Sequence, residues 1–121
     1  MASRKVEDLV PELQAKYHEF SSAMDKAAIE FILTCTLRSQ DEQNELYALG
    51  RTKPGRKVTW TLKSKHIEGK AFDIAILSQG KVTWDKKEYI KAGAIGQAVG
   101  LTWGGSWNTP DYPHFQLKEG T

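Results

Sequence analysis

The chain has 121 residues, the length of one domain, which can bury roughly two-thirds of its unfolded surface in a core. Hydrophobic residues make up 40% of it, and no apolar stretch approaches the roughly 20 residues of a membrane span, which excludes a disordered chain and a membrane-spanning protein. A net charge of +2 is too small for the dense basic surface of a nucleic-acid-binding protein. These numbers predict one soluble globular domain over residues 1–121, with no nucleic-acid partner and no stable membrane association.

The first third of the chain predicts a helix followed by a strand. Apolar residues recur at intervals of three and four residues up to Met24, and Pro11 suits a first helical position because its missing N–H would have no partner there. His18 lies on the polar side of this helix and is interpreted as a surface histidine. The run 29–37 is rich in isoleucine, phenylalanine, leucine and threonine, so it predicts a strand in which Cys35 is buried and inert.

Arg38 lies at the corner between this strand and a short helix. Ser39 and Glu42 have the spacing of a capping box, and Gly50 can end the helix in a left-handed conformation. The next segment, 51–65, has no clear periodicity and carries four basic residues between positions 51 and 57. A loop of this length is commonly functional or mobile, so it is interpreted either as a basic lip that touches a substrate or as a solvated connector.

Side chains alternate along the next predicted strand, 71–77. Phe72, Ile74 and Ile76 point to one face, whereas Asp73 points to the other between two alanines. The small neighbours leave room beside Asp73 for a metal ion and a substrate.

The last third of the chain predicts a hairpin, a helix and two strands. Gln79-Gly80 is typical of a tight turn, and the spacing of Asp85 and Glu88 indicates a helix start of capping-box type. That helix is expected to stop at Gly100, before strands at 101–103 and 112–117. In the final strand His114 shares a face with Gln116, away from the core-seeking residues, so Asp73 and His114 are expected to project from one face of one sheet.

Irregular alternation of helices and strands, with at least one hairpin, indicates an α+β fold with a small mixed or antiparallel sheet and about three helices.

Three residues of the sequence are potential ligands of a metal ion. A catalytic zinc ion usually has three nitrogen or oxygen ligands from the protein, and His66, Asp73 and His114 meet that count. A further carboxylate is needed as a general base, and Asp111, three residues before His114, is the candidate. Each of these residues alone has many structural uses, but together they predict a site for one Zn²⁺ ion.

The same residues carry a family resemblance. The patterns Ser-x-His-x-x-Gly-x-Ala-x-Asp at 64–73 and Trp-x-x-x-Asp-x-Pro-His-Phe at 107–115 resemble the D-alanyl-D-alanine carboxypeptidase and L-alanyl-D-glutamate endopeptidase family of zinc peptidases. The resemblance is closer to the small phage endolysins of that family. It implies an α+β domain of the Hedgehog and D-Ala-D-Ala peptidase type, with zinc held by the three ligands named above.

Roles for the other candidate residues remain open. Arg38 is expected to stabilise the oxyanion, which the resemblance supports; a structural ion pair or an anchor for a substrate carboxylate is the alternative. Ser64 either binds substrate, orients the first histidine, or bonds only to its own backbone. Trp103 and Trp107 either wall the substrate groove or pack in the core. Many relatives have an acidic residue where Ser106 stands, so no role is predicted for it.

The resemblance implies a phage endolysin, a zinc endopeptidase that cuts the L-alanyl-D-glutamate bond of the peptidoglycan stem peptide, with no separate wall-binding module. The alternatives are a D-Ala-D-Ala carboxypeptidase or dipeptidase, and a zinc-bearing wall-binding module without turnover. The charged N-terminus, 1–8, lacks an export signal, so the protein is expected in the host cytoplasm until lysis, when it reaches the wall in the periplasm. A small wall hydrolase is expected to be a monomer.

Overall fold

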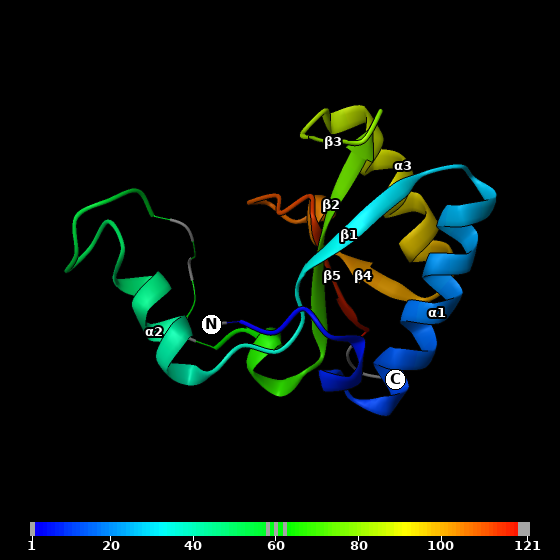
Figure 1. The fold of residues 1–121 in the computed structure, drawn as a ribbon. Coiled ribbons are helices and arrows are strands. Elements are labelled where there is room, and N and C mark those ends of the chain that lie inside the picture. The colour runs from blue at the N-terminus through cyan, green and yellow to red at the C-terminus, as the bar shows by residue number, and fades with distance from the viewer. Residues whose placement is uncertain (1, 58, 60, 62, 119–121) are drawn as a thin grey trace.

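The computed structural model describes residues 2–57, 59, 61 and 63–118 (Figure 1). Its helices and strands follow one another as α1 (Pro11–Lys26), β1 (Glu30–Cys35), α2 (Gln40–Ala48), β2 (Ala71–Ser78), β3 (Lys81–Thr83), α3 (Lys86–Ala98), β4 (Leu101–Trp103) and β5 (His114–Leu117). Three short 3-10 helices lie between them, η1 (Val6–Asp8), η2 (Lys65–Glu68) and η3 (Gly104–Ser106). In this part of the chain no helix combines the length and apolar character that crossing a bilayer requires.

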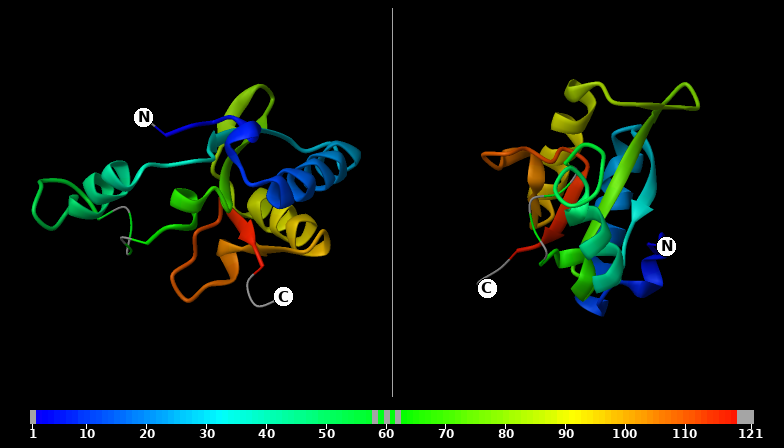
Figure 2. Two further views of the ribbon diagram at one scale, coloured as in Figure 1. Left: turned by 90° about the horizontal axis from the view of Figure 1, so that it is seen from below. Right: turned by 90° about the vertical axis from the view of Figure 1, so that its left-hand side faces the viewer.

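The strands form one antiparallel sheet in the order β1-β2-β5-β4, and β3 pairs with β2 at the end of a hairpin. Helices α1 and α3 lie side by side on one face of this sheet, whereas α2 stands apart from it at the end of a long excursion of the chain (Figures 1 and 2). The predicted α+β class, with three helices and an antiparallel sheet, is confirmed.

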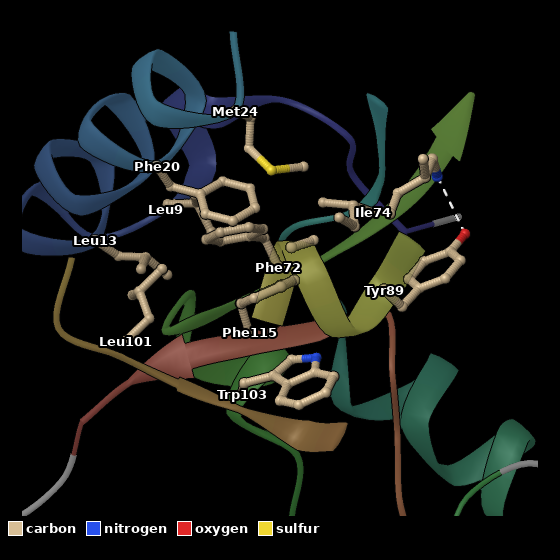
Figure 3. Packing of buried hydrophobic residues seen from close by; sticks show 12 residues of the cluster. Leu9, Leu13, Phe20, Met24, Phe72, Ile74, Tyr89, Leu101, Trp103 and Phe115 are labelled. Atoms are coloured by element: carbon tan, nitrogen blue, oxygen red, sulfur yellow. Dashed lines mark hydrogen bonds between the residues drawn. The ribbon is translucent and has the colours of Figure 1, made fainter. Parts of the chain in front are cut away.

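The core lies between the sheet and the helices α1 and α3 (Figure 3). Phe72 on β2 and Phe115 on β5 are directly paired, and their rings stack with centroids 5.5 Å apart. Phe20 of α1 packs against both rings. Tyr89 of α3 is also buried, and its hydroxyl accepts a hydrogen bond from the Ile76 N–H and donates one to a carbonyl of β3. The residues predicted to face the core from β2 therefore do so.

Two glycines allow α3 to lie close against the sheet. A Cβ atom on Gly93 would be 2.3 Å from the Trp103 ring, and one on Gly96 would be 2.5 Å from the Phe115 ring. Trp103 fills this contact and is 8% exposed, while its indole N–H donates to the Tyr112 carbonyl. The sequence left open whether Trp103 walls the groove or packs in the core, and its position is in the core.

Several local predictions agree closely with the structure. Helix α1 begins at Pro11 and runs two residues past Met24. The capping box of Ser39 and Glu42 is present at the start of α2. Gln79 and Gly80 both have positive φ, as a two-residue hairpin turn requires. Strand β5 begins at 114, later than the predicted residue 112, because the preceding residues form a turn.

Candidate active site

Sheet register brings part of the predicted site together. Asp73 on β2 is the direct partner of His114 on β5, so both side chains leave the same face of the sheet. That face is opposite the one covered by α1 and α3, because the neighbouring Phe72 and Phe115 point into the core. On the other side of β2, Asp73 is paired with Cys35, next to an irregularity in β1.

His66 approaches this row from η2, where Ser64 acts as the N-cap by accepting a hydrogen bond from the His66 N–H. Gly69 ends this turn with φ of +68°, a conformation that side chains rarely adopt. Nδ1 of His66 donates to the Thr36 carbonyl at 2.9 Å, because a carbonyl can only accept. Nε2 of His66 is therefore the ring nitrogen left to face Asp73, and it is buried.

A similar contact orients the other histidine. Nε2 of His114 lies 2.8 Å from Oε1 of Gln116, and an amide oxygen accepts the proton there. Nδ1 of His114 then carries the lone pair and lies 3.0 Å from Oδ1 of Asp73. Nε2 of His66 is 3.2 Å from the same oxygen. Two ring nitrogens and a carboxylate oxygen thus converge, and only a proton or a cation between them makes the arrangement favourable.

The distance of each histidine from Asp73 fits two ligands of one metal ion. With ligand bonds of about 2.0–2.1 Å, neighbouring ligand atoms of tetrahedral zinc are roughly 3.3 Å apart, and two bound imidazole rings have centroids roughly 5 Å apart. The observed contacts to Asp73 are 3.0 and 3.2 Å, and the centroids of the two histidine rings are 5.1 Å apart. Ligand atoms of Cys35, His66 and Asp73 lie within 4.8 Å of one another, as do those of Asp73, Asp111 and His114. Asp73 belongs to both groups. Among the described residues neither group contains both histidines, so the predicted set of His66, Asp73 and His114 is joined through Asp73, and the two histidines do not share a group.

The pKa values of His66 and Asp73 are shifted by the contacts between these residues. Burial disfavours the charged form of His66, but the hydrogen bond and charge of Asp73, with a smaller effect of Cys35, raise the pKa of His66 to about 10. Burial would raise the pKa of Asp73, yet its contacts with His114 and His66 hold that pKa well below the ordinary value. The site therefore retains a proton where a cation can replace it.

Asp111 lies beside the predicted ligands. Its Oδ2 is 4.0 Å from Nδ1 of His114, and its backbone N–H donates to the Gly104 carbonyl at 2.9 Å. Gly104 must lack a side chain here, since a Cβ atom would be 2.5 Å from the Asp111 carbonyl oxygen. Partial burial, together with the charge of Asp73, raises the pKa of Asp111. A carboxylate with a raised pKa is suited to accept and then return a proton.

Arg38 is anchored behind the site. Its guanidinium donates to Oε1 of Gln43 at 2.7 Å and contacts Sγ of Cys35 at 3.4 Å, and its backbone N–H donates to the His66 carbonyl. Gln43 is fully buried, and its amide nitrogen donates to the Thr61 carbonyl. Among the described residues no carboxylate forms an ion pair with Arg38, so the alternative of a structural ion pair has no partner there.

These residues surround a groove with a volume of about 780 Å³. Ser64 and Trp107 line it, and the Trp107 ring centroid is 5.2 Å from that of His114. The lining also contains Arg38, Leu46, Thr59, Thr61, Lys63, Lys65, His66, Asp73, Thr109, Pro110, Asp111, His114 and Gln116.

The basic segment 51–57 does not line this groove. Arg51 donates to the carbonyls of Tyr47 and Thr59 and lies over the Tyr47 ring, and Lys53 pairs with Glu45. Arg51 and Lys53 therefore hold the loop together, and the basic residues that line the groove are Arg38, Lys63 and Lys65.

Comparisons with known proteins agree with this geometry. A family model described as D-alanyl-D-alanine carboxypeptidase matches residues 57–117, which contain both histidines and both aspartates of the site. The chain is 32% identical over 123 residues to the peptidoglycan L-alanyl-D-glutamate endopeptidase CwlK of Bacillus subtilis (strain 168), covering 91% of this chain and 74% of the relative. The chain belongs to the D-alanyl-D-alanine carboxypeptidase family of peptidases. Its structure is similar to the crystal structure of the Serratia marcescens L-Ala D-Glu endopeptidase ChiX, with a TM-score of 0.78, 25% identity and coverage of 98% of this chain and 89% of the other.

Sequence reasoning missed several residues of this peptidase site. Gln43 and Gln116 orient a predicted functional side chain, and Cys35, expected to be inert, contacts both His66 and Arg38. The contact of Gln116 with His114 could have been predicted, because the two residues share one face of a strand. The sequence offered little indication of the role of Gln43, because an amide side chain in a polar helix is ordinarily exposed.

Proposed function

We propose that this protein is a zinc-dependent endopeptidase that hydrolyses the L-alanyl-D-glutamate bond of the peptidoglycan stem peptide. The observation that carries the proposal is the convergence of the free nitrogens of His66 and His114 on Asp73, with Asp111 beside them in an open groove. The choice of bond follows from the two relatives, both of which are L-alanyl-D-glutamate endopeptidases by name.

Zinc in such a site polarises the scissile carbonyl and lowers the pKa of bound water to about 7. The protein supplies the remaining parts. His66, Asp73 and His114 hold the ion, and the orientation of the two histidines is set by the Thr36 carbonyl and the Gln116 amide. Both imidazole rings are thus oriented before substrate arrives.

Asp111 acts as the proton carrier in this proposal. The attacking water gives a proton to Asp111 as its oxygen bonds to the alanyl carbonyl carbon. Asp111 then delivers that proton to the glutamate nitrogen as the peptide bond breaks. A raised pKa suits both steps, since the group must be a base first and an acid afterwards.

Arg38 stabilises the negative charge that develops on the carbonyl oxygen. It lines the groove, and its side chain is held by Gln43 and not neutralised by a described carboxylate. A fixed positive charge contributes most where charge develops in a site with little water. This role is preferred to a purely structural one for these reasons.

The test is muropeptide mapping of purified cell wall by mass spectrometry, with and without a chelator. The proposal predicts a new amino group on D-glutamate, lost with the chelator and restored by zinc. The family description favours a second candidate, cleavage of D-Ala-D-Ala, and release of free D-alanine or its dipeptide would establish that candidate instead.

The Asp111→Asn variant tests the enzyme against the alternative of a wall-binding module without turnover. We expect it to keep its zinc but to lose about 10²- to 10⁴-fold in kcat, the usual contribution of a general base. Asp25→Asn, on the exposed side of α1, is the matched control with unchanged activity. Equal turnover by Asp111→Asn and the parent would contradict the role of Asp111.

The biological role that we propose is lysis of the host at the end of a phage infection, with the enzyme held in the host cytoplasm until it reaches the wall. The motif resemblance to small phage endolysins supports it. Permeabilised Gram-negative cells should lyse when the zinc-loaded protein is added, and Asp111→Asn should leave them intact. Persistent turbidity with an active parent enzyme would contradict the lytic role.

A further inference from the structure

Three basic residues with cationic side chains line the groove, Arg38, Lys63 and Lys65. Thr59, Thr61 and Lys63 all line the groove. The backbone here is held by local contacts, since the Lys63 N–H donates to Oγ1 of Thr61 and the Thr61 carbonyl accepts from Gln43. Lys63 therefore lines the groove with its own backbone N–H and the Thr61 carbonyl both held by hydrogen bonds.

Lys63 differs from the other two groove cations in that none of the described carboxylates pairs with it. Arg38 is held by Gln43, and Lys65 forms an ion pair with Glu68 at 3.5 Å. Lys63 is exposed, and within the described part of the chain no carboxylate forms an ion pair with it. The carboxylates that line the groove are Asp73 and Asp111, and both belong to the reaction centre.

The groove therefore favours a substrate that brings its own negative charge. Lys63 immediately precedes Ser64, the N-cap of the turn that carries His66, so it lies within roughly 10 Å of that ligand along the chain. Lys63 is therefore the groove cation that we consider for a charged group attached close to the scissile bond.

Resting on the function proposed above, we propose that Lys63 binds the free α-carboxylate of the D-glutamate that follows the scissile bond. In the stem peptide this residue continues the chain through its side-chain carboxyl group. Its α-carboxylate is attached to the same carbon as the scissile nitrogen, and some cell walls carry it as an amide. The enzyme then prefers stem peptides whose D-glutamate is not amidated.

The experiment compares kcat/KM of the zinc-loaded enzyme for L-Ala-γ-D-Glu-L-Lys and for the matching D-isoglutamine peptide. We expect the parent to prefer the acid by roughly 5- to 30-fold, between the effects of exposed ion pairs and of hydrogen bonds to charged groups. Lys63→Met should lose this preference through the acid substrate alone, and Lys63→Arg should keep most of it. Lys87→Met, which removes the same charge from the exposed start of α3, is the control and should behave as the parent.

A second measurement uses ionic strength. Added salt should lower kcat/KM for the acid peptide in the parent and in Lys87→Met, but not in Lys63→Met, because the attraction between the two charges is screened. Equal cleavage of acid and amide by the parent, or an unchanged preference in Lys63→Met, would overturn the assignment of Lys63 and leave the endopeptidase intact. Failure of the parent to cut either peptide while it releases D-alanine from cell wall would instead overturn the proposed bond, and the role of Lys63 with it.

Discussion

At the scale of single residues, the site depends on which nitrogen of each imidazole carries the proton. The Thr36 carbonyl sets this for His66 and the Gln116 amide sets it for His114. In both rings the proton held by this acceptor is on the side away from Asp73, so the other nitrogen faces Asp73. On His66 that nitrogen also carries a proton until an ion replaces it.

Gln116→Leu should weaken zinc binding by about 10- to 100-fold, the usual effect of losing a partner that orients a ligand. The reason is that His114 loses the acceptor that keeps its proton on Nε2. Chelator competition measures the affinity, and Gln97→Leu on the exposed side of α3 is the control. Unchanged affinity in Gln116→Leu would show that the tautomer is set elsewhere.

Asp111 should titrate above the ordinary aspartate value in the zinc-free protein, because its partial burial and the charge of Asp73 disfavour its ionised form. Zinc should lower that pKa, since a nearby cation favours the carboxylate. Carbon-13 NMR of the side-chain carboxyl group reports both values. A pKa at or below the ordinary value before zinc is added would contradict the described surroundings of Asp111.

At the scale of elements, the sheet places the site and the turns complete it. Alternation along β2 and β5 was enough to predict that Asp73 and His114 share a face, because the period of a strand fixes side-chain direction. The pairing of these two residues, and the approach of His66 from η2, depend on contacts between distant segments that local patterns do not encode. For the same reason the contact of Arg38 with Gln43 was not predicted.

Gly93→Ala and Gly96→Ala should each destabilise the protein by about 1–3 kcal/mol, the usual effect of overpacking. A Cβ atom at either position would lie within 2.5 Å of an aromatic ring of the sheet. Urea unfolding measures the effect, and its sign is decisive, because the same change in an open helix position stabilises by up to about 1 kcal/mol. Increased stability would mean that α3 does not lie as close to the sheet as described.

Ser39→Ala should lower the free energy of unfolding by about 1 kcal/mol, since it removes the cap at the start of α2. Arg38 immediately precedes this cap, and Gln43 on the same helix holds its guanidinium. We therefore expect kcat to fall as well, with KM for zinc-loaded enzyme little changed. If Ser39→Ala lowered the stability but not kcat, the start of α2 would not determine the position of Arg38.

At the scale of the whole molecule, fold and family were predictable from the sequence. Which basic residues are structural and which line the groove was not. Two short motifs predicted the candidate ligands because they combine residue type with spacing. The basic segment 51–57 was ambiguous, since charge alone does not distinguish Arg51, which holds the loop together, from Lys63, which lines the groove.

Zinc binding near pH 7 should release protons and weaken as the pH falls. With a pKa of about 10, His66 is protonated in the zinc-free protein, and the ion must displace that proton. Titration calorimetry in buffers of different ionisation enthalpy counts the protons released. Binding without any proton release would show that the ion does not replace the proton shared with Asp73.

The central claim is that His66, Asp73 and His114 hold one zinc ion, and anomalous diffraction from a zinc-loaded crystal tests it most directly. The account predicts one strong peak about 2.0–2.2 Å from Nε2 of His66, Nδ1 of His114 and a carboxylate oxygen of Asp73, with Asp111 near but not bound. A peak on Cys35, or one that touches only one of the two histidines, would contradict it.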